Sequence, residues 1–175
     1  MPSGFDQLTK LQTLSNFVIG KGDGHLIREL KILSNLGGNF CLPGLENVNG
    51  RDVREVKKKL EQLITENYGG AKFASWIDDS SFKNLLSLKP RSCKNCKSLP
   101  SVGRLPLLKY LSIIGFHEVQ KIGVEFFGEN ELNSFASLKI LSFESLPIWK
   151  EGDTCEGDEK IILNYLNILS TFLLS

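Results

Sequence analysis

The sequence predicts an α/β repeat protein in which short parallel strands stack side by side, and two observations support this class. First, the pattern L-x-x-L-x-L, with any apolar residue allowed in the last place, recurs at Leu108–Ile113 and at Leu138–Phe143. Second, another apolar residue often stands three places before the first leucine, as Leu105 and Phe135 do. Such alternation suits a strand between two neighbours, because every second side chain then points into a shared core.

The pattern recurs along most of the chain. A copy at Leu85 places Pro90 in the third apolar position, and upstream copies, such as Leu33 with Leu36, are weaker. The first leucines of the six copies are Leu11, Leu33, Leu60, Leu85, Leu108 and Leu138. Their separations are 22, 27, 25, 23 and 30 residues, and all but the last match the period of leucine-rich repeats, about 20–29 residues. We therefore expect a leucine-rich-repeat solenoid with a parallel β-sheet on its concave face and irregular or short helical segments on its convex face.

The repeats predict one domain over residues 1–152, with about six irregular repeats, followed by an acidic loop and an apolar tail over 153–175. The long separation before Leu138 indicates an inserted loop around Gly128–Glu131. In the tail, Leu163–Ile168 matches the repeat pattern once more, but its surroundings also place apolar side chains on one helical face. A seventh repeat and an amphipathic helix are both consistent with this segment.

Composition excludes several classes of protein. The 21 basic and 20 acidic residues leave a net charge of +1, whereas a nucleic-acid-binding domain needs a strongly basic face. The apolar tail is shorter than the roughly 20 residues of a membrane span. The four cysteines show no disulfide framework, and the N-terminus carries no signal peptide pattern. We therefore expect a cytoplasmic protein.

Three short motifs suggest chemistry, but each has a simpler structural interpretation. Gly20–Gly24 lacks the spacing and the Lys-Ser/Thr ending of a phosphate loop, so a loop between repeats is favoured. Cys93 and Cys96 form half of a zinc site without further ligands nearby in sequence, and Cys93 fits the turn that follows a repeat strand. Asp78 and Asp79 have no histidine partner close in sequence. We predict no catalytic residues, no metal site and no cofactor.

The outward side chains of successive strands predict a continuous binding face. Tyr110 between Lys109 and Lys139 predicts a mixed aromatic and basic patch suited to a protein partner. The expected face consists of Gln62, Ile64, Leu86, Ser87, Lys89, Lys109, Tyr110, Ser112, Lys139, Ile140 and Ser142.

A set of longer motifs resembles the leucine-rich-repeat region of plant disease resistance proteins of the coiled-coil, nucleotide-binding type. The motifs are Leu11–Gly22, Ile27–Lys31, Leu45–Val48, Tyr68–Ile77, Cys93–Pro106 and Glu144–Trp149, in this order. The resemblance covers roughly residues 1–152 and implies a non-enzymatic module for protein–protein interaction in defence. The implied partners are a pathogen effector, a host protein or the nucleotide-binding domain of a longer relative.

Departures from the family pattern indicate a truncated product. No G-x-x-x-x-G-K-[ST] loop occurs, so the sequence disfavours the alternative of a nucleotide-dependent ATPase switch. A second alternative is the extracellular receptor type of leucine-rich repeat. That type carries abundant glycosylation sequons, and this sequence contains none.

Overall fold

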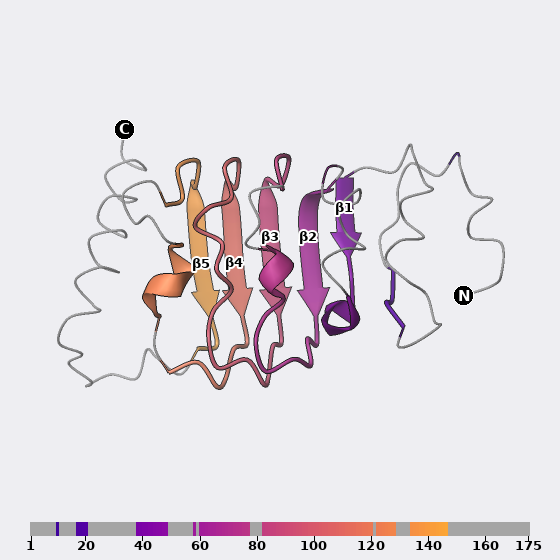
Figure 1. The fold of residues 1–175 in the computed structure, drawn as a ribbon, viewed down its shortest axis with the longest axis vertical. Helices are drawn as coiled ribbons and strands as arrows, with labels where there is room; N and C mark the ends of the chain where they lie inside the picture. Colours follow the sequence, from indigo (N-terminus) through magenta and orange to yellow (C-terminus); the bar gives the residue numbers. More distant parts are fainter. Residues whose placement is uncertain are drawn as a thin grey trace.

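The computed structural model describes residues 10, 17–20, 38–48, 58, 60–77, 82–120, 122–128 and 134–146. Within them, five strands form one parallel sheet in sequence order (Figure 1). The strands are β1 Gly38–Cys41, β2 Leu60–Glu66, β3 Ser87–Arg91, β4 Tyr110–Ile114 and β5 Ile140–Glu144. Three short 3-10 helices, η3 Leu45–Asn47, η4 Ser75–Ile77 and η5 Val124–Phe126, lie in the connections. The predicted leucine-rich-repeat fold is confirmed: parallel strands carry one face, and loops with short helical turns cross the other (Figure 1).

The leucine pattern correctly predicts which side chains face the core in β2 to β5. The second leucines of the copies, Leu63, Leu88, Leu111 and Leu141, are paired residues on neighbouring strands. Leu63, Leu88 and Leu111 are fully buried, and the residue two places further along each strand also points inward. Because each short strand covers only part of the core, no repeat can enclose its leucines without a neighbour on either side.

The prediction for the repeat before β2 was wrong in its register. Phe40, and not Leu36, pairs with Leu63, so Leu33 and Leu36 are not the anchors of that repeat. Phe40 and Leu42 are both buried and fill the two inward positions. A buried phenylalanine serves as well as leucine here, since what the position requires is apolar volume facing the core.

The parallel hydrogen-bonding pattern continues on the N-terminal side of β1. The Phe17 N–H donates to the Cys41 carbonyl at 3.0 Å, and the Ile19 N–H donates to the Pro43 carbonyl at 2.8 Å. Phe17 and Ile19 are both buried. These contacts extend the stack beyond β1, whereas the predicted anchors Leu11 and Leu14 lie outside the described residues.

Pro90 lies inside a central strand, where proline is uncommon because it cannot donate a backbone hydrogen bond. It is buried, as predicted, and pairs with Thr65 of β2. On the other side, β3 and β4 pair at Leu88 with Leu111 and at Arg91 with Ile114, while the pairing between these two points is interrupted. Pro90 is therefore accommodated in β3, but the backbone pairing between β3 and β4 is missing around it.

Every strand from β2 to β5 ends in the same way. The residue after the strand has a positive φ: 53° at Asn67, 56° at Ser92, 71° at Gly115 and 57° at Ser145. Its N–H donates to the last strand residue of the next repeat in three cases, for example from Ser92 to the Ile114 carbonyl at 2.9 Å. This left-handed residue turns the chain from the sheet towards the loop side, although only Gly115 adopts the conformation without strain.

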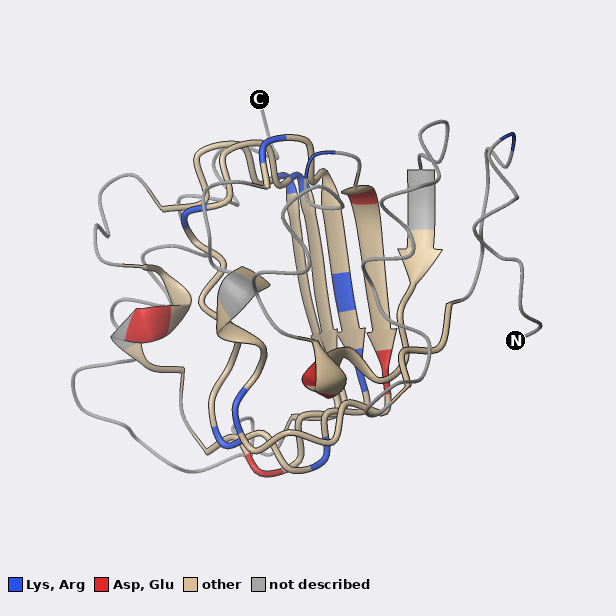
Figure 2. Cartoon of the chain, turned by 45° about the vertical axis from the view of Figure 1, so that its right-hand side comes forward, with Lys and Arg blue, Asp and Glu red and all other residues tan. Residues whose placement is uncertain are grey.

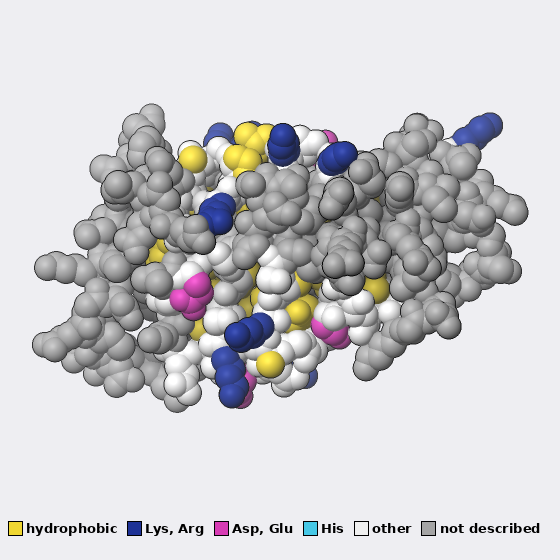
Figure 3. All heavy atoms as spheres, viewed as in Figure 1, with side chains coloured by type: hydrophobic (Ala, Val, Ile, Leu, Met, Phe, Trp, Pro, Cys, Tyr) yellow, Lys and Arg dark blue, Asp and Glu magenta, His cyan; other side chains and the backbone are white. Residues whose placement is uncertain are grey.

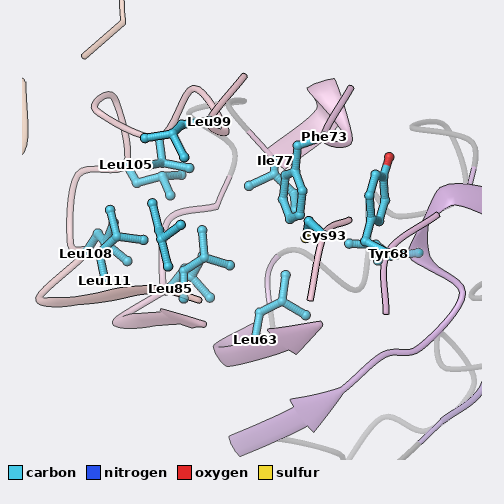
Figure 4. Close-up of a cluster of buried hydrophobic side chains, with 14 of the residues drawn as sticks. Leu63, Tyr68, Phe73, Ile77, Leu85, Cys93, Leu99, Leu105, Leu108 and Leu111 are labelled. Carbon is cyan, nitrogen blue, oxygen red and sulfur yellow. The ribbon is translucent and has the colours of Figure 1, made fainter. Parts of the chain in front are cut away.

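The core between the sheet and the loops is filled by leucines from the strands and, further out, by a mixture of aromatic and aliphatic side chains that includes Phe73, Ile77 and Leu99 (Figure 4). Tyr68 and Phe73 form one tilted ring pair, with centroids 4.9 Å apart. Near β5, the Phe126 ring lies 5.3 Å from Phe127 and 5.1 Å from Phe135. These two aromatic groups lie in the connections on the loop side of the core.

Side-chain amides join successive coils on the loop side. The Asn47 amide donates to the Ile19 carbonyl at 3.2 Å, and the Asn95 amide donates to the Gly69 carbonyl at 3.1 Å. Asn47 and Asn95 occupy the same place, seven residues after the inward residues Phe40 and Leu88 of their repeats. The leucine pattern does not predict this pair, because both asparagines lie in the turns beyond it.

One inward position carries a polar group. Thr65 of β2 is 1 % exposed, and its hydroxyl has no hydrogen-bond partner among the described residues. An unpaired buried hydroxyl is destabilising by about 1–3 kcal/mol. Replacing Thr65 with valine, which has nearly the same shape, is therefore expected to raise the free energy of unfolding by about 1 kcal/mol. Chemical denaturation measures the change, and Thr65→Ser, which keeps the hydroxyl and loses a methyl group, should not be stabilised.

Candidate protein-binding surface

The side chains that point away from the core form four rows across the sheet face opposite the loops, which we call the outer sheet face. Each row consists of outward residues at equivalent positions on neighbouring strands, as given by the strand register. The first row consists of the residues that directly precede the second row in sequence, and backbone hydrogen bonds link them. From β2 to β5, the first row is Glu61, Leu86, Lys109 and Lys139; the second is Gln62, Ser87, Tyr110 and Ile140; the third is Ile64, Lys89, Ser112 and Ser142; the fourth is Glu66, Arg91, Ile114 and Glu144. All eleven residues of the expected binding face fall in the first three rows.

The outer sheet face is uneven in exposure. Tyr110 is 45 % exposed and Ile140 is 51 % exposed, and the two are direct partners across β4 and β5. Lys139 is exposed and Lys109 is half-buried, both beside this apolar pair. On β2 and β3, by contrast, the predicted residues are half-buried. The structure thus brings together the aromatic and basic patch that the sequence suggested, with Ile140 as its central apolar partner.

The fourth row was missed by sequence analysis. Arg91 lies beside Glu66, with an Arg91 Nη1 to Glu66 Oε1 distance of 3.5 Å, and both side chains are about two-fifths exposed. Glu144 is exposed two strands further along. The L-x-x-L-x-L pattern stops before this row, and only the strand length shows that the outer sheet face extends to it. Figure 2 shows an acidic and a basic residue side by side at this end of the sheet.

Cys93 and Cys96 lie in the turn after β3, and both side chains are fully buried. The Cys96 thiol donates to the Gly70 carbonyl of the preceding coil at 3.3 Å. The hydrogen bond with Cys96, and then burial, raise the pKa of the Cys93 thiol above its ordinary value. Close by, burial raises the pKa of Tyr68 to about 12. These cysteines therefore pack one coil on the next, and Cys96 as well as Cys93 belongs to the repeat turn.

This geometry leads to a prediction about zinc. A zinc site needs four ligands and deprotonated thiols, and no group of three or more metal-binding side chains occurs in the described part of the chain. We expect purified protein to carry no stoichiometric zinc, and its melting temperature to be unchanged by a chelator. Elemental analysis and thermal denaturation with and without EDTA test this, and one zinc per chain lost together with the fold would contradict it.

The other two motifs fall largely outside the described residues. Gly20 follows the buried Ile19, but the rest of the predicted glycine-rich loop up to Gly24 lies outside them, as do Asp78 and Asp79. The tail over 153–175, with its candidate seventh repeat, also lies outside.

The loop side differs in character from the outer sheet face. Figure 3 shows it with Lys and Arg side chains along the upper and lower rims and hydrophobic side chains between polar ones. Among the residues that the structure describes, none belongs to a helix with the length and apolar character of a membrane span.

Comparisons with known proteins agree with this architecture. Residues 55–116 match the family model described as R13L1/DRL21 LRRs. A candidate disease resistance protein of Arabidopsis thaliana is 37 % identical over 188 residues, covering 81 % of this chain and 13 % of the relative. The candidate disease resistance RPP13-like protein 1 of the same plant is 34 % identical over 71 % of this chain, again covering 13 % of the relative.

A third relative comes from another plant. The candidate disease resistance protein RGA4 of Solanum bulbocastanum is 29 % identical over 91 % of this chain and 20 % of its own length. No solved structure gives a significant match. The chain thus spans a fifth or less of each of these relatives. Repeat pattern, parallel sheet and relatives agree, and the chain belongs to the leucine-rich-repeat family of plant disease resistance proteins.

Proposed function

We propose that this chain is a non-enzymatic, cytoplasmic module that binds another protein in plant defence through its outer sheet face. The observation that carries the proposal is the pair of exposed apolar side chains, Tyr110 and Ile140, on a continuous sheet surface. Tyrosine is enriched among the residues that dominate binding energy at protein interfaces. The partners that fit the relatives' role are a pathogen effector, a host protein, or the nucleotide-binding domain of a longer relative.

Several features support binding over catalysis. The outer sheet face carries basic, acidic, polar and apolar side chains, and its described residues include no histidine. Its two carboxylates in the fourth row, Glu66 and Glu144, are separated by Arg91 and Ile114, so they do not form a paired-carboxylate site for general acid–base catalysis. A parallel sheet with regularly repeated outward side chains offers a continuous contact area for a protein surface.

Quantitative co-purification from plant tissue tests the proposal. The tagged full chain should retain a defined partner, and the double variant Tyr110→Ala, Ile140→Ala should retain it at least about 10-fold less, as expected for loss of a central apolar anchor. Lys94→Ala, an exposed change in the turn after β3, serves as the matched control and should retain the partner fully. Equal recovery of the partner with the double variant and the wild type would show that the outer sheet face is not the binding site.

A further inference from the structure

Two pairs of side chains meet at the start of β4 and β5, one of like charge and one exposed and apolar. Lys109 and Lys139 are neighbours in the first row, since the Lys139 N–H donates to the Lys109 carbonyl at 2.8 Å. Tyr110 and Ile140 are neighbours in the second row, where both are about half exposed. We call these four residues the basic–apolar site.

The lysine pair lowers the stability of the folded protein. Neighbouring strands lie about 4.8 Å apart, and like charges directly opposite each other on a sheet are destabilising. No salt bridge joins either lysine to a carboxylate among the described residues. The acidic residue in the same row, Glu61, stands on β2, two strands or about 10 Å from Lys109. The two ammonium groups therefore lack a neutralising partner within this part of the sheet.

The apolar pair leaves hydrophobic surface exposed to water at the same place. Tyrosine and isoleucine side chains gain stability when they are removed from water. Polar side chains surround this pair on the outer sheet face: Ser87 precedes it in the second row, and Ser112 and Ser142 follow it in the third. The apolar contact area is therefore small and confined to β4 and β5, directly beside the two lysines.

We propose that the basic–apolar site binds an acidic segment of a protein partner, in which a carboxylate lies between Lys109 and Lys139 and an adjacent apolar side chain packs on Tyr110 and Ile140. This rests on the proposed function and specifies the chemistry of the partner. A nucleic acid fits less well, because a phosphate backbone that followed β5 from Lys139 would meet the Glu144 carboxylate in the fourth row.

Selection from a phage-displayed library of random 12-residue peptides on the full chain tests the proposal. Enriched peptides should contain Asp or Glu next to Leu, Phe or Trp. Binding of a labelled selected peptide, followed by fluorescence anisotropy, should weaken as salt is raised, because exposed charge pairs are screened. Lys139→Glu should weaken it by about 30-fold or more, as for loss of a central contact combined with charge repulsion.

Two controls separate binding from folding and from net charge. Lys139→Glu turns a like-charge pair into an opposite-charge pair with Lys109, so its melting temperature should rise slightly while binding is lost. Lys94→Glu makes the same change of net charge in the turn after β3 and should alter the peptide affinity less than about 3-fold, as for surface charges remote from an interface.

The outcomes distinguish the two proposals. If no acidic peptide is enriched, or if Lys139→Glu and Lys94→Glu have equal effects, the acidic-partner inference is overturned. If the enriched peptides are not acidic but still lose binding with Tyr110→Ala, Ile140→Ala, the inference fails and the outer sheet face remains the binding surface. If that double variant has no effect on any enriched peptide, both proposals fail.

Discussion

Replacing Leu111 with alanine is expected to destabilise the protein by about 2–5 kcal/mol, the usual cost of truncating a fully buried leucine. Leu111 is 1 % exposed and lies between Leu88 on β3 and Leu141 on β5, so the cavity would open in the centre of the sheet. Small domains have only about 5–15 kcal/mol of total stability. Urea denaturation followed by circular dichroism should show a large fall in the midpoint, or a variant that no longer folds.

Tyr110→Ala is the matched control, because Tyr110 is the neighbour of Leu111 on the same strand and points the other way. A surface change of this kind alters stability by roughly 0.5 kcal/mol or less. The variant should keep the fold and lose only partner binding. Equal destabilisation by the two changes would show that the inward and outward assignment of β4 is incorrect, and the outer sheet face would lose its basis.

Truncating Phe126 is expected to have an effect at least as large, about 3–5 kcal/mol, because the removed ring is central to an aromatic cluster. Phe126 is 1 % exposed, and its ring contacts those of Phe127, Phe135 and Phe143, the last with centroids 6.1 Å apart. The cluster joins the loop side of the β4 repeat to an inward residue of β5. Its loss should therefore loosen the longest connection in the described sheet.

Denaturation of Phe126→Ala beside Phe126→Leu measures the contribution of the cluster. Leucine keeps much of the apolar volume, so its cost should be clearly smaller than that of alanine. Hydrogen exchange should show faster opening of β5 than of β2 in the alanine variant, since β5 lies over the lost ring and β2 lies three strands away. Uniform opening of all strands, or an alanine variant as stable as the wild type, would contradict this account.

Strand positions were predictable where the repeat pattern is complete. The second leucines of the copies, Leu63, Leu88, Leu111 and Leu141, occupy equivalent places in the sheet. These places could be predicted because alternate side chains of a strand face the core, and this gives an apolar pattern of period two in a single sequence. The same logic identified Tyr110 and its lysine neighbours as outward residues. The buried position of Pro90 also followed from its place in the pattern, although proline is a poor strand residue.

Other features depend on which residues meet across the stack, and the linear pattern does not contain this information. Phe40 replaces a leucine and pairs with Leu63, which is visible only from the register of β1 and β2. Thr65 is buried because it faces the core of the stack, although its hydroxyl has no partner among the described residues. Arg91 and Glu66 extend the outer sheet face beyond the last leucine position, because the strands are longer than the motif.

The basic–apolar site depends most on tertiary structure. Tyr110 and Ile140 are 30 residues apart in the chain, and the connection between them is longer than the other separations in the repeat pattern. Leucine spacing predicts that both side chains point outward. Their direct pairing, and the pairing of Lys109 with Lys139, follow from the hydrogen bonds between β4 and β5. The additional residues of the long connection lie outside these strands. Insertions there leave the register of parallel strands unchanged, because the sheet is aligned by its backbone and its inward side chains.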